Sequence, residues 1–183
     1  GEGKTTVSEN LAFALAQMEN VLLIDADMRR PSLGARFGLS SSHPGLSNLI
    51  AGSANLASCI HHDEQSGLDL IPAGAIPRMP QELLASDRFE RLLNKLREKY
   101  DRIIIDTAPL QVVSDAQVVS RVADSMLYVV KSDSTRQKVV ESGIRKLYKV
   151  GANLEGLVLN QVDTSSKSSN YGEYYGYYGG RYD

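Results

Sequence analysis

Residues 1–6 read GEGKTT, and this short run bears most directly on the fold. It matches the second half of the GxxxxGK[ST] phosphate-binding loop, whose glycines let backbone N–H groups approach phosphate oxygens closely. In such a loop Lys4 reaches the β- and γ-phosphates, and the Thr5 hydroxyl binds magnesium. The first glycine of the full motif is absent, and for the bare string a glycine turn before an ordinary helix is the better interpretation. The choice between a phosphate-binding loop and a simple glycine turn therefore depends on the surrounding sequence.

Carboxylates follow two short apolar runs further along the chain. Residues 21–27 read VLLIDAD, which places Asp25 and Asp27 at the end of an expected strand, and residues 103–106 read IIID, which places Asp106 in the same way. Ligands of open α/β sheets bind beyond the carboxyl ends of the strands, where a carboxylate holds Mg²⁺ directly or through water. A single aspartate of this kind is compatible with a helix cap or a solvated strand end. Three of them, alongside a Gly-Lys-Thr loop, favour a nucleotide site.

The rest of the chain alternates strand-like and helix-like segments. Expected strands cover residues 21–24, 68–71, 102–105, 126–130 and 157–159, and expected helices follow the loop, begin near Asp87, and cover residues 135–150. This alternation predicts an α/β domain of the P-loop NTPase type, with three layers and a mainly parallel sheet flanked by helices on both faces. No strand precedes the loop, so we expect an N-terminally truncated domain whose first strand lies before Gly1.

Composition excludes several classes of protein. An apolar content of 42% is sufficient for a sizeable core. A net charge of -2 gives no electrostatic reason to expect nucleic acid as a partner. Cys59 is the only cysteine, which excludes an internal disulfide and a cysteine-rich zinc site. No run approaches the roughly 20 apolar residues of a membrane span.

The composition changes after Asp163, which divides the chain into a domain at residues 1–163 and a tail at residues 164–183. The tail is mostly Ser, Gly and Tyr and has no aliphatic residue to bury, so we expect it to be flexible. Its last thirteen residues contain six tyrosines, which are Tyr171, Tyr174, Tyr175, Tyr177, Tyr178 and Tyr182.

These segments resemble the cytoplasmic kinase domain of the bacterial tyrosine kinases that regulate capsule and exopolysaccharide synthesis, the BY-kinases. GEGKTT resembles their Walker A motif, VLLIDADMRRPSL (21–33) their second acidic motif, and IIIDTAP (103–109) their Walker B motif. Further similar segments are GLSNLIAG (45–52), LDLIPAG (68–74) and VLNQVD (158–163), so the resemblance covers nearly the whole chain. The Walker motifs are shared with many ATPases, whereas DADMRRP combined with the tyrosine cluster is much more specific.

The resemblance implies a non-specific protein-tyrosine kinase that uses ATP and Mg²⁺ to phosphorylate the six tyrosines of its own tail. It assigns nucleotide binding to Gly1, Gly3, Lys4, Thr5 and Thr6, with Asn160 at the base; metal binding to Thr5, Asp27 and Asp106; and catalysis to Lys4, Asp25, Asp27 and Asp106. Asp25 is the candidate acceptor of the tyrosine proton, although its division of labour with Asp27 stays open. A loop asparagine at a strand end is an almost equally good interpretation of Asn160.

The resemblance also implies a setting. The kinase domain would lie in the cytoplasm at the inner face of the cell membrane and would act on the tail of a neighbouring subunit in a homo-oligomer. Its activator would be a membrane-embedded polysaccharide co-polymerase, either separate or fused upstream. The main alternative is a switch ATPase of the partition or division-site type, which shares the motifs but has no use for clustered tyrosines. A degenerate adaptor domain is a third interpretation, and the intact lysine and aspartates argue against it.

Other candidates have simpler interpretations. The run at 61–63, His-His-Asp, has no third metal ligand placed nearby by spacing, and a solvated loop is preferred. Arg29 and Arg30 are candidates for contacts with phosphate or a neighbouring subunit. The remaining tyrosines, Tyr100, Tyr128 and Tyr148, follow helix or strand patterns and are interpreted as packing residues.

Overall fold

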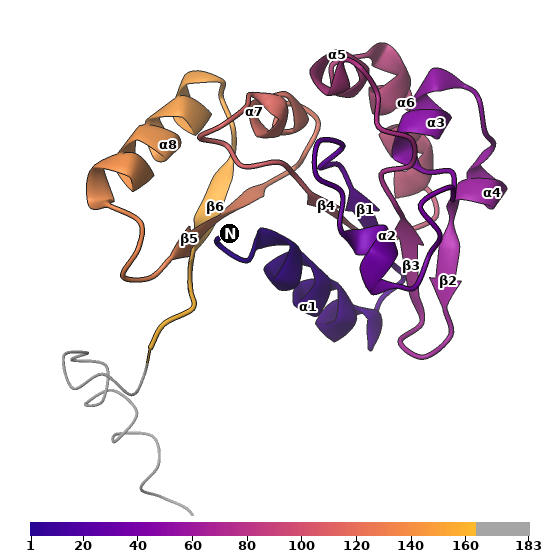
Figure 1. The fold of residues 1–183 in the computed structure, drawn as a ribbon, viewed down its shortest axis with the longest axis horizontal. Coiled ribbons are helices and arrows are strands. Elements are labelled where there is room, and N and C mark those ends of the chain that lie inside the picture. The colour runs from indigo at the N-terminus through magenta and orange to yellow at the C-terminus, as the bar shows by residue number, and fades with distance from the viewer. Residues whose placement is uncertain (164–183) are drawn as a thin grey trace, which may run out of the picture.

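The computed structural model describes residues 1–163, which form two groups of strands covered by helices (Figure 1). The six tail tyrosines and the expectation of a flexible tail lie outside the described residues. In chain order the elements are α1 (Lys4–Ala16), β1 (Val21–Asp25), α2 (Leu33–Arg36), α3 (Leu46–Ala51), α4 (Leu56–Cys59), β2 (His61–Asp63), β3 (Leu68–Ile71), α5 (Pro80–Leu84), α6 (Asp87–Arg97), β4 (Arg102–Asp106), α7 (Asp115–Val119), β5 (Met126–Lys131), α8 (Gln137–Lys149) and β6 (Leu154–Asn160). Among the described helices, none is long and apolar enough to span a membrane.

The strands are mainly parallel, as the sequence predicts. Four of them form one sheet in the order β2-β3-β1-β4, in which β1 is parallel to both β3 and β4. Only β2 runs antiparallel, along the edge of β3. The other two strands, β5 and β6, form a separate parallel pair. Parallel strands align their carboxyl ends at one edge, so the residues that follow β1 and β4 come together there.

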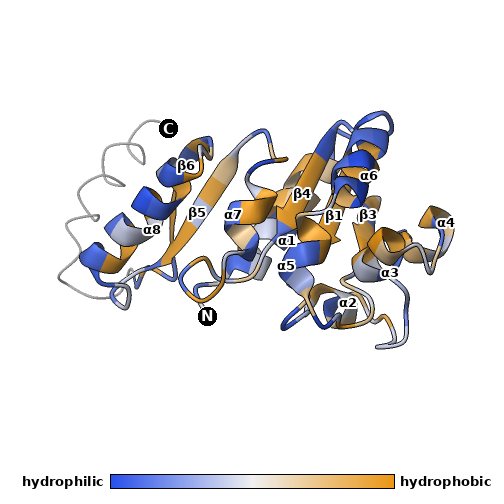
Figure 2. Cartoon of the chain, turned by 90° about the horizontal axis from the view of Figure 1, so that it is seen from above, coloured by the Kyte–Doolittle hydropathy of each residue, from blue (hydrophilic) through white to orange (hydrophobic). Residues whose placement is uncertain are grey.

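Alternate side chains of β1 explain why helices cover both faces of the larger sheet. Val21 and Leu23 pack with Ala12 of α1 on one face. Leu22 and Ile24 pack on the other face with residues of α6, including Phe89. A strand buried on both sides is apolar at nearly every position, and all five residues of β1 are buried, with Asp25 at its carboxyl end the one that is not apolar. Figure 2 shows this directly, with hydrophobic colour along β1, β3 and β4 and hydrophilic colour on much of α6.

Helix α6 illustrates how local sequence sets the boundaries of an element. The Ser86 hydroxyl accepts a hydrogen bond from the backbone N–H of Phe89, which caps the start of the helix. Acidic residues in the first turn and basic residues in the last turn oppose the charges of the helix dipole. The expected start near Asp87 is therefore confirmed.

Two sequence expectations outside the site are wrong. The residues at 61–63 form strand β2 rather than a solvated loop, because they pair with β3, and His62 Nδ1 lies 2.7 Å from Asp69 Oδ1. Tyr148 is not a packing residue, since 64% of it is exposed on α8. Tyr128 does pack, and its ring leaves no room for a side chain at Gly143 of α8. Tyr100 is half-buried, and its hydroxyl donates a 2.6 Å hydrogen bond to Asp69 Oδ2.

A groove separates the two groups of strands. Within residues 1–163 no ladder joins β4 to β5, and a cavity of about 330 Å³ lies between them. Its lining comes from α1, α6, β4, the segment after α7, and β5, and it includes the apolar side chains of Leu11, Ile104 and Leu127. Gly1 lies at the carboxyl end of β6, where its carbonyl oxygen accepts a hydrogen bond from Gln161 Nε2 at 3.3 Å. A strand that ran parallel to β4 and led into Gly1 would therefore occupy this groove.

We expect an added strand to stabilise the domain. Extending the chain before Gly1 by five alternating valine and isoleucine residues should raise the free energy of unfolding by about 2 kcal/mol or more, since each buried side chain of this size contributes roughly that amount. Urea unfolding of the extended and unextended chains would measure the difference. A five-residue extension of glycine and serine is the matched control. Equal stabilisation by both extensions would show that the groove does not accept a strand.

Candidate active site

The loop before α1 is held in a conformation that requires glycine. Gly3 has a φ of 85°, in the left-handed region, and directly precedes the first turn of the helix. A Cβ at this position would collide with the side-chain amide of Asn160. That amide instead donates a 2.9 Å hydrogen bond to the carbonyl oxygen of Glu2. Asn160 therefore fastens the loop to the end of β6.

The side chains of the loop point toward the strand ends. Thr5 Oγ1 donates a 2.6 Å hydrogen bond to Asp106 Oδ2, and Ser8 Oγ lies 3.5 Å from the other oxygen of the same carboxylate. Lys4 Nζ forms a 3.0 Å ion pair with Glu2 Oε2. A partly exposed ion pair between residues two positions apart contributes little energy, so the ammonium group can exchange Glu2 for a phosphate.

Two buried carboxylates face each other at the ends of adjacent strands. Asp25 and Asp106 are partners in the β1–β4 register, and their exposed fractions are only 1% and 2%. Burial and the nearby charge of Asp106 together raise the pKa of Asp25 to about 6, although backbone hydrogen bonds to its carboxylate act in the opposite direction. Burial also raises the pKa of Asp106, whereas the hydrogen bond from Thr5 lowers it. Charge at this edge is thus poorly solvated, which is the condition under which a cation binds strongly.

Asp25 also organises the loop between β1 and α2. Its Oδ2 accepts hydrogen bonds from the backbone N–H groups of Ser32 and Leu33, both at 3.1 Å, and its Oδ1 accepts one from Asp27 at 3.1 Å. Asp27 is half-buried, and its Oδ1 accepts from the N–H groups of Arg29 and Arg30. Backbone donors thus hold three oxygens of this pair, and Asp27 has the more accessible carboxylate.

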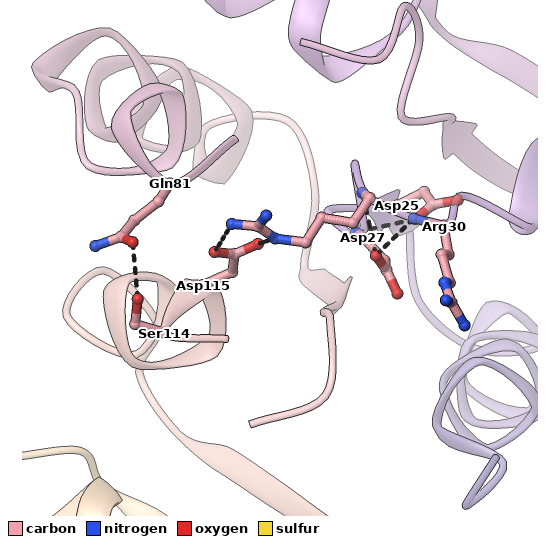
Figure 3. A network of polar contacts seen from close by, with 7 residues as sticks. Asp25, Asp27, Arg30, Gln81, Ser114 and Asp115 are labelled. Atoms are coloured by element: carbon pink, nitrogen blue, oxygen red, sulfur yellow. Dashed lines mark hydrogen bonds and ion pairs between the residues drawn. The ribbon is translucent and has the colours of Figure 1, made fainter. Parts of the chain in front are cut away.

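An ion pair ties this loop to α7 (Figure 3). The Arg29 guanidinium donates to both oxygens of the fully buried Asp115, from Nε at 2.8 Å and from a terminal nitrogen at 3.1 Å. Next to it, Ser114 Oγ donates a 2.8 Å hydrogen bond to Gln81 Oε1 on α5. Arg29 is therefore already engaged by a carboxylate of its own chain. The Arg30 side chain is exposed in the same loop.

Two of the segments quoted for the resemblance lie against each other at the same edge. The backbone N–H groups of Leu46 and Ser47 donate to the carbonyl oxygens of Pro72 and Ala73, at 2.8 and 3.0 Å. Ser47 Oγ also donates a 2.6 Å hydrogen bond to the carbonyl oxygen of Ala75. These bonds fix the start of the loop that leads from β3 to α5.

The donor set fits a magnesium nucleotide. Within residues 1–163 no three His, Cys, Asp or Glu side chains converge into a metal cage. Mg²⁺ usually needs no such cage, because it keeps several waters and binds one or two carboxylates together with phosphate oxygens. Asp106 and the adjacent Thr5 hydroxyl supply hard oxygen ligands of this kind. The helix start at Gly3 supplies backbone N–H groups for phosphate.

The residues singled out from the sequence share one edge of the sheet. Lys4, Thr5, Asp25, Asp27 and Asp106 all lie there, and Asn160 reaches the same loop from β6. Sequence reasoning missed two contributors. Asp115, the partner of Arg29, looks like an ordinary acidic residue at a helix start, and Ser8 looks like one polar position of α1. Neither carries a local signal that could have identified it.

This geometry defines a P-loop nucleotide-binding domain, and the AAA domain family matches residues 1–160 of the chain. More narrowly, the chain belongs to the bacterial tyrosine-protein kinases. It superimposes on the kinase domain of VpsO with a TM-score of 0.86 at 47% sequence identity, covering 89% of this chain and 80% of that one. It is 36% identical over 178 residues to the putative tyrosine-protein kinase CapB of Staphylococcus aureus, covering 97% of this chain and 76% of CapB.

Longer relatives show that this domain also occurs within larger proteins. The chain is 38% identical over 165 residues to tyrosine-protein kinase ptk of Acinetobacter johnsonii, which is 90% of this chain but 22% of that protein. A plasmid partition protein of Borrelia burgdorferi superimposes with a TM-score of 0.73 at 20% identity, covering 95% of this chain. The latter likeness shows the fold alone. The closer relatives favour the kinase interpretation over the partition ATPase.

The raised pKa of Asp25 leads to a prediction about stability in metal-free buffer. Its folded pKa of about 6 lies above the ordinary value of 3.8. Its contribution to the free energy of unfolding is therefore full below pH 3.8 and is lost as pH rises through 6. The wild-type chain should lose about 3 kcal/mol of unfolding free energy over this range from Asp25. Asp25→Asn should lack that loss.

Urea unfolding in EDTA, at steps from pH 4.5 to 7.5, would measure how the unfolding free energy of the wild-type chain and of Asp25→Asn changes with pH. The absolute stability of Asp25→Asn is not diagnostic, because an amide cannot accept hydrogen bonds from all three backbone donors. Equal slopes for the two proteins would show that Asp25 does not carry this titration.

Proposed function

We propose that the full-length protein is a tyrosine autokinase that transfers the γ-phosphate of ATP to tyrosines of its own C-terminal segment. The observation that carries this proposal is the contact of Thr5 with Asp106, beside a second buried carboxylate, in a chain that ends with six clustered tyrosines. The site supplies the means of holding a magnesium nucleotide. The terminal segment supplies acceptors in the same chain.

Positioning and electrostatics account for most of phosphoryl transfer. Bound Mg-ATP supplies the transferable phosphoryl group and most of the neutralising charge. Lys4 would leave Glu2 to steady the β- and γ-phosphates, and Thr6 would lie beside them. Thr5 and Asp106 would hold the metal, together with Asp27 through water. Gly1 and Gly3 would line the phosphates with backbone groups.

The acceptor tyrosine must lose its proton as its oxygen begins to bond. A free tyrosine has a pKa near 10, so a neighbouring carboxylate is needed at neutral pH. Asp25 is the candidate in this proposal, since burial raises its pKa to about 6, closer to the working pH. Its three backbone donors keep the carboxylate in one orientation. Asp27, which is more accessible, is the alternative acceptor.

Asn160 has two compatible roles. Its side-chain nitrogen already bonds to the loop through Glu2. The proposal adds a contact of its side-chain oxygen with the adenine base. Loop anchoring and base recognition would then depend on the same residue, at the end of β6.

The cellular location, the regulated process and the activator are also part of the proposal, and the membership in the bacterial tyrosine-protein kinases supports them. The protein would work in the cytoplasm at the inner face of the membrane, phosphorylate the tail of a neighbouring copy, and regulate the synthesis or export of capsular or exopolysaccharide. Its activator would be a membrane-embedded partner. A solved relative bears the name CapA2B2 and is described as a chimerical protein, with 37% identity to this chain and a TM-score of 0.85.

One experiment distinguishes the residues that bind the nucleotide from the tyrosines that accept the phosphoryl group. The full-length protein is incubated with Mg-ATP, and phosphotyrosine is mapped by mass spectrometry. Lys4→Met and Asp106→Asn should each lower autophosphorylation by more than about 10²-fold, since each removes a charge that stabilises the transferring group or its metal. Replacing the six tail tyrosines with phenylalanine should also remove the product.

The affinity for ATP distinguishes these variants. The phenylalanine variant should bind ATP as the wild-type protein does in calorimetry, whereas Lys4→Met should bind it more weakly. If the phenylalanine variant lost ATP affinity as severely as Lys4→Met, the division into site and substrate would be wrong. ATP hydrolysis with no phosphotyrosine at any position would instead support the partition-type switch.

A further inference from the structure

Two residues with an unfavourable backbone conformation follow the paired strands β5 and β6. Asp133 has a φ of 53° and Gln161 a φ of 57°, and within residues 1–163 they are the only residues other than glycine with a positive φ. A side chain makes this left-handed conformation costly, and aspartate tolerates it better than glutamine does. Such a conformation persists only where surrounding contacts require it. The contacts of Gln161 must therefore offset its cost.

The left-handed conformation points the Gln161 side chain at the phosphate-binding loop. Consecutive side chains of an extended strand point to opposite faces, so Asn160 and Gln161 could not otherwise reach one target. A φ of 57° in place of a strand value of about -120° turns the Cβ of Gln161 by roughly half a circle about its N–Cα bond. Gln161 Nε2 then donates a 3.3 Å hydrogen bond to the Gly1 carbonyl oxygen, beside the 2.9 Å bond from Asn160 to Glu2. Two consecutive amides thus hold two consecutive carbonyl groups.

This pair of amides, the Asn160–Gln161 clasp, has a fixed base. Asn160 pairs with Lys131 in the β5–β6 ladder, and its carbonyl oxygen accepts a 2.8 Å hydrogen bond from the backbone N–H of Ser132. Both amides also lie against Gly3, since a Cβ there would collide with the Asn160 amide and would lie 3.5 Å from Gln161 Nε2. The strand pair therefore dictates where the loop carbonyls lie.

The clasp determines the direction of the loop N–H groups. In a trans peptide the C=O and N–H bonds point in opposite directions. Holding the carbonyl oxygens of Gly1 and Glu2 on the β6 side therefore turns the N–H groups of Glu2 and Gly3 away from β6. Backbone N–H groups of such loops are the donors that cradle phosphate. Donors that are placed before the ligand arrives bind it at a lower entropic cost.

We infer that Gln161 is a positioning residue for phosphate binding. It acts through the Gly1 carbonyl on the orientation of the loop, without a contact of its own to the base or to the phosphates. Asn160, by contrast, combines the loop contact with the proposed base contact. The inference rests on the nucleotide binding that the proposed function requires, and it adds a residue to which the motifs assign no separate role.

A comparison of three ligands tests this role. The full-length protein is loaded with a fluorescent ATP analogue in magnesium buffer, which is then displaced by ATP, ADP or inorganic tripolyphosphate. Gln161→Met keeps the length of the side chain but removes its N–H donor. It should weaken all three ligands by a similar factor of about three to ten, the range that one hydrogen bond supports. Gln65→Met, at an exposed position in the turn before the amino end of β3, is the matched control and should bind as the parent does.

A second variant separates positioning from stability. Gln161→Gly also removes the donor, but glycine adopts a positive φ without steric cost. Its free energy of unfolding in urea should therefore equal or exceed that of the parent, while its affinity for tripolyphosphate falls as in Gln161→Met. In autophosphorylation assays both variants should raise the KM for ATP and leave kcat unchanged. A merely structural role would lower stability and affinity together.

The outcomes separate this inference from the kinase proposal. Unchanged affinities in both Gln161 variants would overturn the positioning role and leave the kinase proposal standing. Weaker ATP and ADP with unchanged tripolyphosphate would also overturn it, because Gln161 would then act on the nucleoside. Equal weakening of all three ligands, in a protein that forms no phosphotyrosine, would uphold the positioning role and overturn the kinase proposal.

Discussion

Two carboxylates opposed across adjacent parallel strands, Asp25 and Asp106, set the main constraint on this domain. Neither is solvated, so their charges must be offset by the protein or by a bound cation. Backbone N–H groups do this for Asp25, and Thr5 does it for Asp106. The path of the loop after β1 and the position of the first helical turn of α1 both follow, because each must bring its donors to these oxygens.

The same constraint links parts of the chain that are distant in sequence. The loop that satisfies Asp25 also carries Arg29, which is the counter-ion of the buried Asp115. Removing Arg29 would leave the buried Asp115 carboxylate without a counter-ion, so the loop and α7 are held together energetically. On the opposite side, Asn160 joins the phosphate-binding loop to β6. The site is therefore assembled by polar contacts between elements, on a sheet that apolar packing provides.

The sequence was sufficient for the parallel strands and for the edge at which the strand-end aspartates meet, because periodicity and strand-end aspartates are local signals. Strand β1 and helix α6 were predicted from their apolar patterns and flanking residues. Strand β2 was not, since a three-residue edge strand with two histidines has no apolar pattern and exists only through pairing with β3. The short helices α2 to α5 and α7 were not predicted either, because each is too short for a clear apolar pattern and depends on tertiary contacts. Asp115 became visible only when the fold placed it beside Arg29.

The groove between β4 and β5 has a consequence for how the domain opens. Strands β5 and β6 share a ladder with each other, and Leu147 of α8 packs in a small core of its own with Ala116 and Ala152. Opening this C-terminal unit breaks no backbone ladder of the four-stranded sheet within the described residues. In the chain of residues 1–183, with no strand in this groove, amide protons of β5 and β6 should therefore exchange with solvent through sub-global openings, while those of β1 exchange only when the whole sheet unfolds. A phosphate-binding loop anchored to β6 through Asn160 would loosen with the first of these events, so the order of unfolding would begin at the nucleotide site.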